Sequence, residues 1–201
     1  MGLIVSTWVI VLIKHFGSAK QRLQPVLGPK ARRGLARRNA RLAVRAAAAG
    51  DRVLVVAGGE GVADLAEVWG ADVLLEPREE GQNVAAARGI ARAVEGGAEA
   101  VLLLSSDLPL VTIDAVREVL EAGSRLKAPA VMAVPAVGRG GTNALYLRPP
   151  DAITLHFGDD SLAQFRHEAE SRGVTFAVHH SDAMALDLDE PGDLARLRRA
   201  V

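Results

Sequence analysis

Two segments of this chain carry apolar side chains on both faces, and this constrains the fold more than any other feature. They are RVLVVAG (52–58) and AVLLLSS (100–106). A strand with one buried face alternates apolar and polar residues, whereas a strand covered by helices on both sides is apolar nearly throughout. The two segments therefore predict central strands of a sheet that lies between two layers of helices.

Apolar runs of this kind alternate along the chain with longer segments of helical periodicity. Strands are expected at 8–13, 52–57, 72–76, 100–105, 130–135, 142–148, 175–179 and 184–188. Helices are expected at 29–49, 61–69, 83–95, 113–127, 162–172 and 191–200. Pro29 suits a first helical position, and Thr112 and either Asp160 or Ser161 suit N-caps. Strand and helix alternate four times in the first half, which predicts a three-layer α/β fold with a mostly parallel sheet.

Composition limits the classes of function. A length of 201 residues without a linker or internal repeat predicts one domain over residues 1–201. The 24 basic and 24 acidic residues give a formal net charge of zero, so nothing overall favours nucleic acid or an anionic membrane. The absence of cysteine excludes disulfides and thiolate metal sites, and it agrees with a cytoplasmic location. The apolar stretch 8–13 is too short to span a bilayer, and we expect no signal peptide.

The loop after the first expected strand is basic. Lys14, Lys20 and Arg22 flank Gly17 and Ser18. In open parallel sheets, ligands bind beyond the carboxyl ends of the strands, so this loop lies at the functional edge. Glycine lets backbone N–H groups approach an anion, and the basic side chains add charge, so the loop can hold a polyphosphate. The alternative is a surface loop with solvated cations.

Three aspartates are candidate ligands of a divalent metal. Asp107 directly follows the most apolar strand, at the same functional edge. Asp187 and Asp189 are two residues apart, which places both carboxylates on one face of an extended segment. Mg²⁺ prefers hard oxygen ligands and is commonly held by a few carboxylates plus substrate phosphates. The alternatives are a turn at Asp107 and a helix cap at Asp189 or Asp193.

Three polar turns also precede or follow strands. The polar residues are Arg139, Thr142 and Asn143 in GRGGTNALYL, Gly158 and Ser161 in HFGDDS, and Gly81 and Asn83 in EPREEGQN. The first turn could hold a hydrophilic substrate. The second opens a helix, whose exposed N–H groups favour an anion, although an ordinary N-cap is the alternative. The third places a helix start near the end of a strand.

One segment of the chain is strongly basic and lacks acids. Residues 30–45 include Lys30, Arg32, Arg33, Arg37, Arg38, Arg41 and Arg45. On a helix these side chains cover more than one side. The segment is either a solvated cationic face or a docking face for an acidic partner.

Together these segments resemble the 2-phospho-L-lactate (or phosphoenolpyruvate) guanylyltransferase family of coenzyme F-420 biosynthesis. The matching segments are IKHFGSAKQRL, EPREEGQN, SSDLPL, GGTNALYLRPP, FGDDS and ALDLDEPGDL, in the family's order. The resemblance implies a Rossmann-like nucleotidyltransferase fold that uses GTP and Mg²⁺. The implied reaction joins GMP to a phosphorylated three-carbon acid and releases pyrophosphate.

The resemblance also assigns roles to individual residues. It implies that the metal is held by Asp107, Asp187 and Asp189, and that the three-carbon acid is held by Thr142, Gly158 and Ser161. It also implies that the basic loop is formed by Lys14, Lys20 and Arg22, and that Asn83 lies near the nucleotide. The acid is phosphoenolpyruvate, 2-phospholactate or 3-phosphoglycerate, and the bacterial-looking composition favours the first. The acceptor phosphate is already anionic, so no protein base is expected.

Two alternatives stay open at this point. One is another Mg²⁺-dependent nucleotidyltransferase that uses CTP or a sugar phosphate. The other is a non-catalytic module that docks a partner through the basic segment 30–45. A homodimer, and transfer of the product to the next enzyme of the pathway, are compatible with the resemblance.

Overall fold

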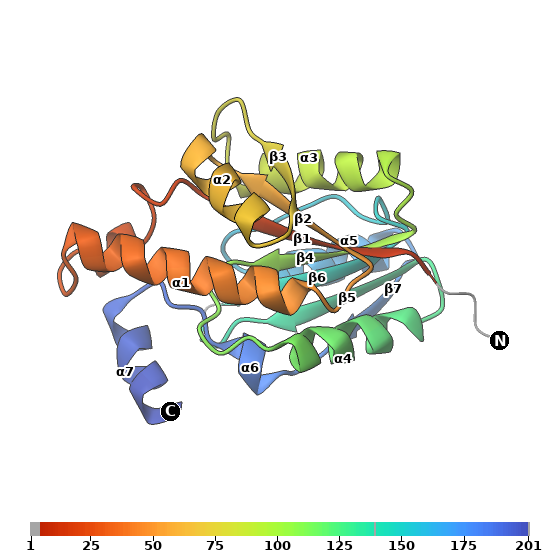
Figure 1. The fold of residues 1–201 in the computed structure, drawn as a ribbon. Coiled ribbons are helices and arrows are strands. Elements are labelled where there is room, and N and C mark those ends of the chain that lie inside the picture. The colour runs from red at the N-terminus through yellow and green to blue at the C-terminus, as the bar shows by residue number, and fades with distance from the viewer. Residues whose placement is uncertain (1–4, 139, 201) are drawn as a thin grey trace.

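A computed structural model describes residues 5–138 and 140–200 of the chain (Figure 1). Its strands are β1 (Thr7–Ile13), β2 (Arg52–Ala57), β3 (Asp72–Leu75), β4 (Ala100–Ser105), β5 (Ala130–Pro135), β6 (Thr142–Arg148) and β7 (Thr175–Val178). Its helices are the short 3-10 helix η1 (Gln21–Leu23), α1 (Pro29–Ala47), α2 (Glu60–Val68), α3 (Gln82–Glu95), α4 (Ile113–Ser124), α5 (Ser161–Ser171), α6 (Asp182–Ala185) and α7 (Pro191–Ala200). The expected elements therefore exist, with one exception described below.

The seven strands form one sheet in the order β3-β2-β1-β4-β6-β5-β7. Neighbouring strands pair in parallel except at β6, which is antiparallel to both β4 and β5. The predicted mostly parallel sheet is confirmed. Because β6 runs backwards, its first residues lie at the edge where β1 and β4 end. This reversal brings the turn before β6 to the edge at which parallel sheets bind ligands.

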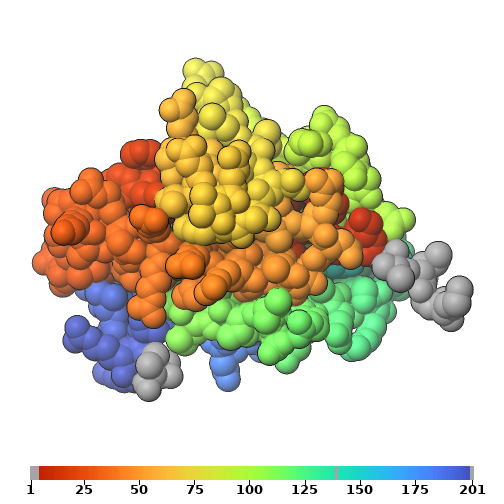
Figure 2. Space-filling view, viewed as in Figure 1, coloured from red at the N-terminus to blue at the C-terminus, as the bar shows by residue number. Residues whose placement is uncertain are grey.

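Successive residues of the central strands enter two separate cores. In β1, Val9 and Val11 pack with α1, α2 and α4 on one face of the sheet. Trp8 and Ile10 pack with α3 and α5 on the other face. Figure 1 shows the two helical layers, and Figure 2 shows the face that α1, α2 and α4 cover. The structure thus has the three layers expected from strands that are apolar on both faces.

The predicted strand at 184–188 is wrong. Leu186 and Leu188 are buried and Asp187 is half-buried, so the alternation read from the sequence is correct. Its backbone, however, makes no ladder with another strand among residues 5–138 and 140–200. Asn143 Nδ2 donates to the carbonyl of Met184 at 2.8 Å, and Leu188 N donates to the carbonyl of Asp107 at 3.1 Å. The segment 184–188 is therefore a strap across the end of the sheet, in which Met184 and Ala185 are the last residues of α6 and residues 186–188 have no regular secondary structure.

Helix α1 carries the basic segment, and most of that segment faces solvent. Its exposed basic residues are Lys30, Arg33, Arg37, Arg38, Arg41 and Arg45. No ion pair joins them to an acid within the part of the chain that the structure describes. Arg32 differs because it is buried and donates from Nη1 to Gln21 Oε1 at 2.9 Å. Among residues 5–138 and 140–200, no helix is both long and apolar enough to cross a bilayer.

Gly89 allows α3 to pack closely against the sheet. A Cβ atom at Gly89 would lie 2.8 Å from Cγ2 of Ile10 and 2.9 Å from Cγ2 of Val56. We expect Gly89→Ala to lower the free energy of unfolding by about 1–3 kcal/mol in urea denaturation, because the core must shift to admit the methyl group. Gly34→Ala, within α1, is the matched control because no heavy atom lies within 4 Å. It should be neutral or stabilising by up to about 1 kcal/mol. Equal effects would contradict this account.

Candidate active site

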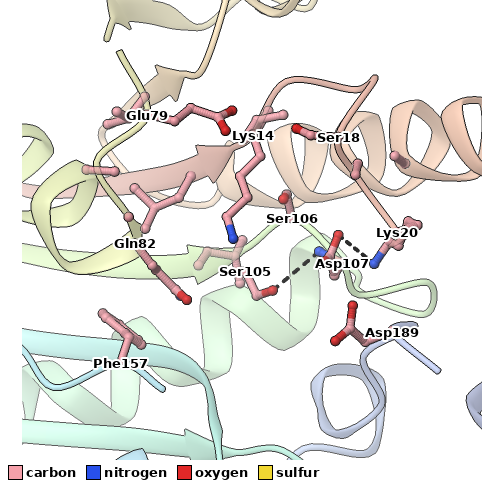
Figure 3. Close-up of a pocket in the computed structure, with 18 of the residues that line it drawn as sticks. Lys14, Ser18, Lys20, Glu79, Gln82, Ser105, Ser106, Asp107, Phe157 and Asp189 are labelled. Carbon is pink, nitrogen blue, oxygen red and sulfur yellow. Dashed lines mark hydrogen bonds and ion pairs between the residues drawn. The ribbon is translucent and has the colours of Figure 1, made fainter. Parts of the chain in front are cut away.

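A cleft of about 550 Å³ lies where β1 and β4 end and β6 begins (Figure 3). Its size is typical of small-molecule sites, which occupy roughly 300–1,000 Å³. Its polar lining residues are Lys14, Ser18, Lys20, Gln21, Arg22, Glu76, Glu79, Gln82, Ser105, Ser106, Asp107, Thr142, Asn143 and Asp189. The cleft therefore lies at the edge of the sheet that the sequence predicted.

Lys20 and Asp107 form an ion pair at one end of this cleft. Lys20 Nζ lies 2.8 Å from Asp107 Oδ1 and also donates to the carbonyl of Leu188. The Lys20 side chain is only 1% exposed, whereas that of Asp107 is 40% exposed. A buried ammonium group is strongly destabilising without an acidic partner. Lys20 also has a left-handed backbone, with φ of 60°, which costs roughly 1–2 kcal/mol.

The backbone of Asp107 is held as firmly as its carboxylate. Its carbonyl accepts from Leu188 N at 3.1 Å and from Asn39 Nδ2 at 3.4 Å. Its N–H donates to Ser105 Oγ at 3.3 Å. Asn39 is fully buried on α1, so a helix that contributes little to the lining still positions the aspartate. The carboxylate of Asp107 is thus fixed in the cleft before any ligand binds.

A second, more exposed ion pair lies beside the first. Arg22 Nη1 is 3.2 Å from Asp189 Oδ2 and 3.5 Å from Glu190 Oε1, and the Arg22 side chain is 65% exposed. Exposed pairs contribute little to stability, so Arg22 can exchange its partners for a ligand at small cost.

Asp193, which the sequence offered as a cap, accepts from the N–H groups of Asp189 and Glu190 at 3.0 and 2.8 Å.

Two of the three predicted metal carboxylates line the cleft. Asp107 and Asp189 do so, whereas Asp187 is half-buried and does not. Within residues 5–138 and 140–200, no three histidine or acidic side chains come together as a metal centre. The three predicted metal ligands therefore do not come together in this structure. The carboxylates of Asp107 and Asp189 are instead paired with Lys20 and Arg22. One or two carboxylates plus substrate phosphates is nevertheless a usual ligand set for Mg²⁺, so the donors present fit that ion.

Asn83 holds a loop and does not line the cleft. Its Nδ2 donates to the carbonyl of Phe157 at 3.1 Å, and its Oδ1 accepts from the N–H of Phe157 at 2.8 Å. Phe157 itself lines the cleft and packs edge-on against Phe165, with 5.1 Å between ring centroids. The Asn83 side chain, predicted to lie near the nucleotide, thus bonds in this structure to the backbone of Phe157 and holds it at the cleft.

Ser161 supports Thr142 in a similar way. Ser161 is 1% exposed, and its Oγ donates to Thr142 Oγ1 at 3.1 Å, while Thr142 lines the cleft. Asn143 also lines the cleft, but its Nδ2 holds the strap through the carbonyl of Met184. Thr142 and Asn143, at the start of β6, therefore both line the cleft, while Ser161 of α5 holds the Thr142 hydroxyl and the Asn143 amide holds the strap.

The predicted site residues separate into two groups. Those that line the cleft are Lys14, Lys20, Arg22, Gly81, Asp107, Thr142, Asn143 and Asp189, and those that do not are Gly17, Asn83, Gly158, Ser161 and Asp187. Gly17 lies within the basic loop, where its N–H donates to His15 Nδ1 at 3.1 Å. Arg139 lies outside the described residues. The carboxyl edge of the sheet was thus correctly predicted, but the sequence did not distinguish the side chains that face the cleft from those beside it.

Sequence reasoning singled out the segment EPREEGQN, the loop between β3 and the start of α3, for Gly81 and Asn83 but did not name its other polar residues. Glu76, Glu79 and Gln82 line the cleft. Arg88 anchors this loop, with Nη1 3.0 Å from Glu76 Oε1 and Nη2 bonded to Glu80. The pKa of Arg88 is raised, chiefly by its hydrogen bond to Glu80 and also by that to Glu76. A signal was present, because a loop after a parallel strand that carries several acids lies at the functional edge.

The family model for "Guanylyl transferase CofC like" matches residues 7–198, which is nearly the whole chain. The chain belongs to the CofC-like guanylyl transferase family. The phosphoenolpyruvate guanylyltransferase of Rubrobacter xylanophilus is 40% identical over 197 residues, covering 96% of this chain and 94% of the relative. The 2-phospho-L-lactate guanylyltransferase of Methanothermobacter thermautotrophicus is 35% identical over 198 residues, covering 96% and 84%.

Solved structures support the fold of this CofC-like chain. A putative nucleotide-diphospho-sugar transferase from Desulfovibrio desulfuricans superimposes with a TM-score of 0.76 at 16% identity. The match covers 98% of this chain and 88% of the other. The nucleotidyltransferase-like fold expected from the sequence is therefore confirmed.

The contact between Asn83 and Phe157 can be tested without a substrate. We expect Asn83→Ala to speed hydrogen exchange at the Phe157 amide by about 10-fold, because both hydrogen bonds are lost. Gln82→Ala is the control, since no hydrogen bond joins the Gln82 side chain to this loop within the described residues. Unchanged exchange in Asn83→Ala would mean that ring packing alone holds the loop.

Proposed function

We propose that this CofC-like protein transfers the guanylyl group of GTP to phosphoenolpyruvate, releases pyrophosphate and uses Mg²⁺. One observation carries the proposal: a single cleft holds a basic loop, with Lys14, Lys20 and Arg22, beside the carboxylates of Asp107 and Asp189. Both substrates are polyanions, so a site for them must supply positive charge and ligands for a counter-cation.

The chemistry requires no general base from the protein. A phosphate oxygen of the acceptor attacks the α-phosphorus of GTP, and the bond from that phosphorus to the α,β-bridging oxygen breaks. Pyrophosphate leaves with the electron pair, and no proton moves because the attacking phosphate is already ionised. The work of the protein is to align the two anions and to stabilise the leaving group.

The residues of the cleft have distinct parts in this reaction. Lys14 and Arg22 offer positive charge to the phosphates, while the ion pair with Lys20 holds the carboxylate of Asp107 in position. Mg²⁺, when held by Asp107 and Asp189, supplies charge that offsets the anionic phosphates. Thr142, oriented by Ser161, offers a hydroxyl to the three-carbon acid.

The names of the relatives support the choice of acid. The bacterial relative at 40% identity is named for phosphoenolpyruvate, and the more distant archaeal one for 2-phospho-L-lactate. These acids differ by a few atoms beside the carboxylate. Phosphoenolpyruvate is therefore the first acceptor to test, as an enzyme of coenzyme F-420 biosynthesis would use it.

The acceptor is tested by following pyrophosphate release with Mg²⁺, GTP and one acid at a time. We expect turnover with phosphoenolpyruvate at least about 10-fold above that with 2-phospholactate or 3-phosphoglycerate, with the guanylylated product identified by mass spectrometry. Replacing GTP by CTP, ATP or UTP tests the alternative nucleotides. Turnover with CTP alone, or with a sugar phosphate, would contradict the proposal and favour a nucleotidyltransferase that uses CTP or a sugar phosphate.

Asp107→Asn tests the role of the fixed carboxylate. We expect kcat to fall by about 10³-fold or more, because an amide binds Mg²⁺ poorly. The asparagine Oδ1 can still accept from Lys20, but the buried ammonium loses its acidic partner, so urea denaturation should show a folded protein of lower stability. Asp114→Asn, at the exposed start of α4, is the matched control and should retain activity. Full activity in Asp107→Asn, with loss on charge reversal at Arg37 and Arg41, would instead favour the docking module.

A further inference from the structure

The two ends of the cleft differ in how their acids are paired. Figure 3 shows Lys20, Asp107 and Asp189 at one end and Glu79 and Gln82 at the other, with Lys14 extending between them. At the first end each carboxylate has a basic partner. At the second end, no ion pair joins Glu79 to a basic residue within the part of the chain that the structure describes.

The carboxylate of Glu79 is nevertheless held in a defined position. Its Oε1 accepts from the backbone N–H of His15 at 2.6 Å. It also packs directly on the backbone of Gly58, where a Cβ atom would lie 2.3 Å from Oε1. No hydrogen bond to Oε2 is found among the described residues. Oε2, together with the second lone pair of Oε1, therefore remains available to a ligand in the cleft.

The neighbouring glutamates of the same loop are used differently. Arg88 bonds to both Glu76 and Glu80. Glu76 also lines the cleft, but its side chain is 7% exposed and its carboxylate is occupied. Arg88 of α3 thus neutralises Glu76 and Glu80, whereas Glu79, the third acid, lines the cleft without a basic partner among the described residues.

A carboxylate in a site for polyanions is repulsive unless the ligand offers it hydrogen-bond donors. The triphosphate of a nucleotide has none, but its base can. Guanine carries adjacent N1–H and N2–H donors, which match the two oxygens of a carboxylate. Adenine and cytosine place a ring-nitrogen acceptor at the corresponding position, and uracil flanks its single N–H with two carbonyls. Only guanine among the four bases satisfies a carboxylate with two parallel hydrogen bonds.

We propose that Glu79 is the residue that selects guanine, by accepting hydrogen bonds from N1–H and N2–H of the base. The inference rests on the proposed use of GTP and deepens it. It also orients the nucleotide: the base lies at the Glu79 end, and the triphosphate extends past Lys14 towards Lys20 and Asp107. Charge then matches along the whole cleft, with the acid against the donors of the base and the basic residues against the phosphates.

The test compares GTP with inosine triphosphate, which lacks only the 2-amino group. We expect the wild-type protein to prefer GTP by about 10-fold in kcat/KM, the effect of one charge-assisted hydrogen bond. In Glu79→Gln, kcat/KM for GTP should fall by about 10- to 100-fold and the ratio of GTP to inosine triphosphate should approach one. Glu79→Ala should also lose the preference. Glu80→Gln, with the same charge change next to it, should keep the wild-type ratio.

The design separates base selection from a merely structural role. Glutamine can still accept from the N–H of His15, so a residue that only anchors the basic loop would leave the nucleotide ratio unchanged. A wild-type ratio in both Glu79 variants overturns the proposal even if both rates fall. If the wild-type protein makes no guanylylated product, the proposed function fails, and calorimetric binding of the two nucleotides carries the test. Loss of the affinity ratio in Glu79→Gln supports the role of Glu79, and an unchanged ratio or no GTP binding overturns it.

Discussion

A buried ammonium group fixes the architecture of the cleft. Lys20 lies in the loop after β1, Asp107 lies after β4, and Leu188 belongs to the strap near the C-terminus. The three are distant in sequence, and the charge of Lys20 is compensated only when all three meet. The left-handed backbone of Lys20 is the local cost of this arrangement. The basic loop, the aspartate and the strap therefore form as one unit, and the cleft is the space that they enclose with β6.

The framework of the protein could be predicted because it depends on local patterns. Strands apolar on both faces, such as β2 and β4, require two helical layers, and the side-chain periods identify most helices to within a few residues. The edge at which ligands bind follows from strand direction alone. The segment 184–188 misled the prediction because the half-buried Asp187 lies between the buried Leu186 and Leu188, as in a strand. Its backbone partners, Asn143 and Asp107, come from distant parts of the chain, and no local pattern reports them.

The candidate site was harder to predict for the same reason. Sequence reasoning chose residue types suited to binding, yet Asn83 and Ser161 do not line the cleft and instead bond to Phe157 and Thr142, which do. Amides and hydroxyls serve equally well as ligand contacts and as braces, and only the fold decides between these uses. Glu79 was overlooked because sequence reasoning named only Gly81 and Asn83 in the segment that contains it. The role proposed for Glu79 depends on its position at one end of the cleft, and the sequence alone does not show that position.

The exposed basic residues of α1 have a consequence for the molecule as a whole. The helix holds seven cations and no acid, while the complete chain is neutral, so the remainder carries an equal excess of acid. The protein is thus an electric dipole of considerable size despite its zero net charge. Near an extended anionic surface, the protein would turn the side that carries α1 towards that surface. A protein of zero net charge therefore still has a preferred orientation.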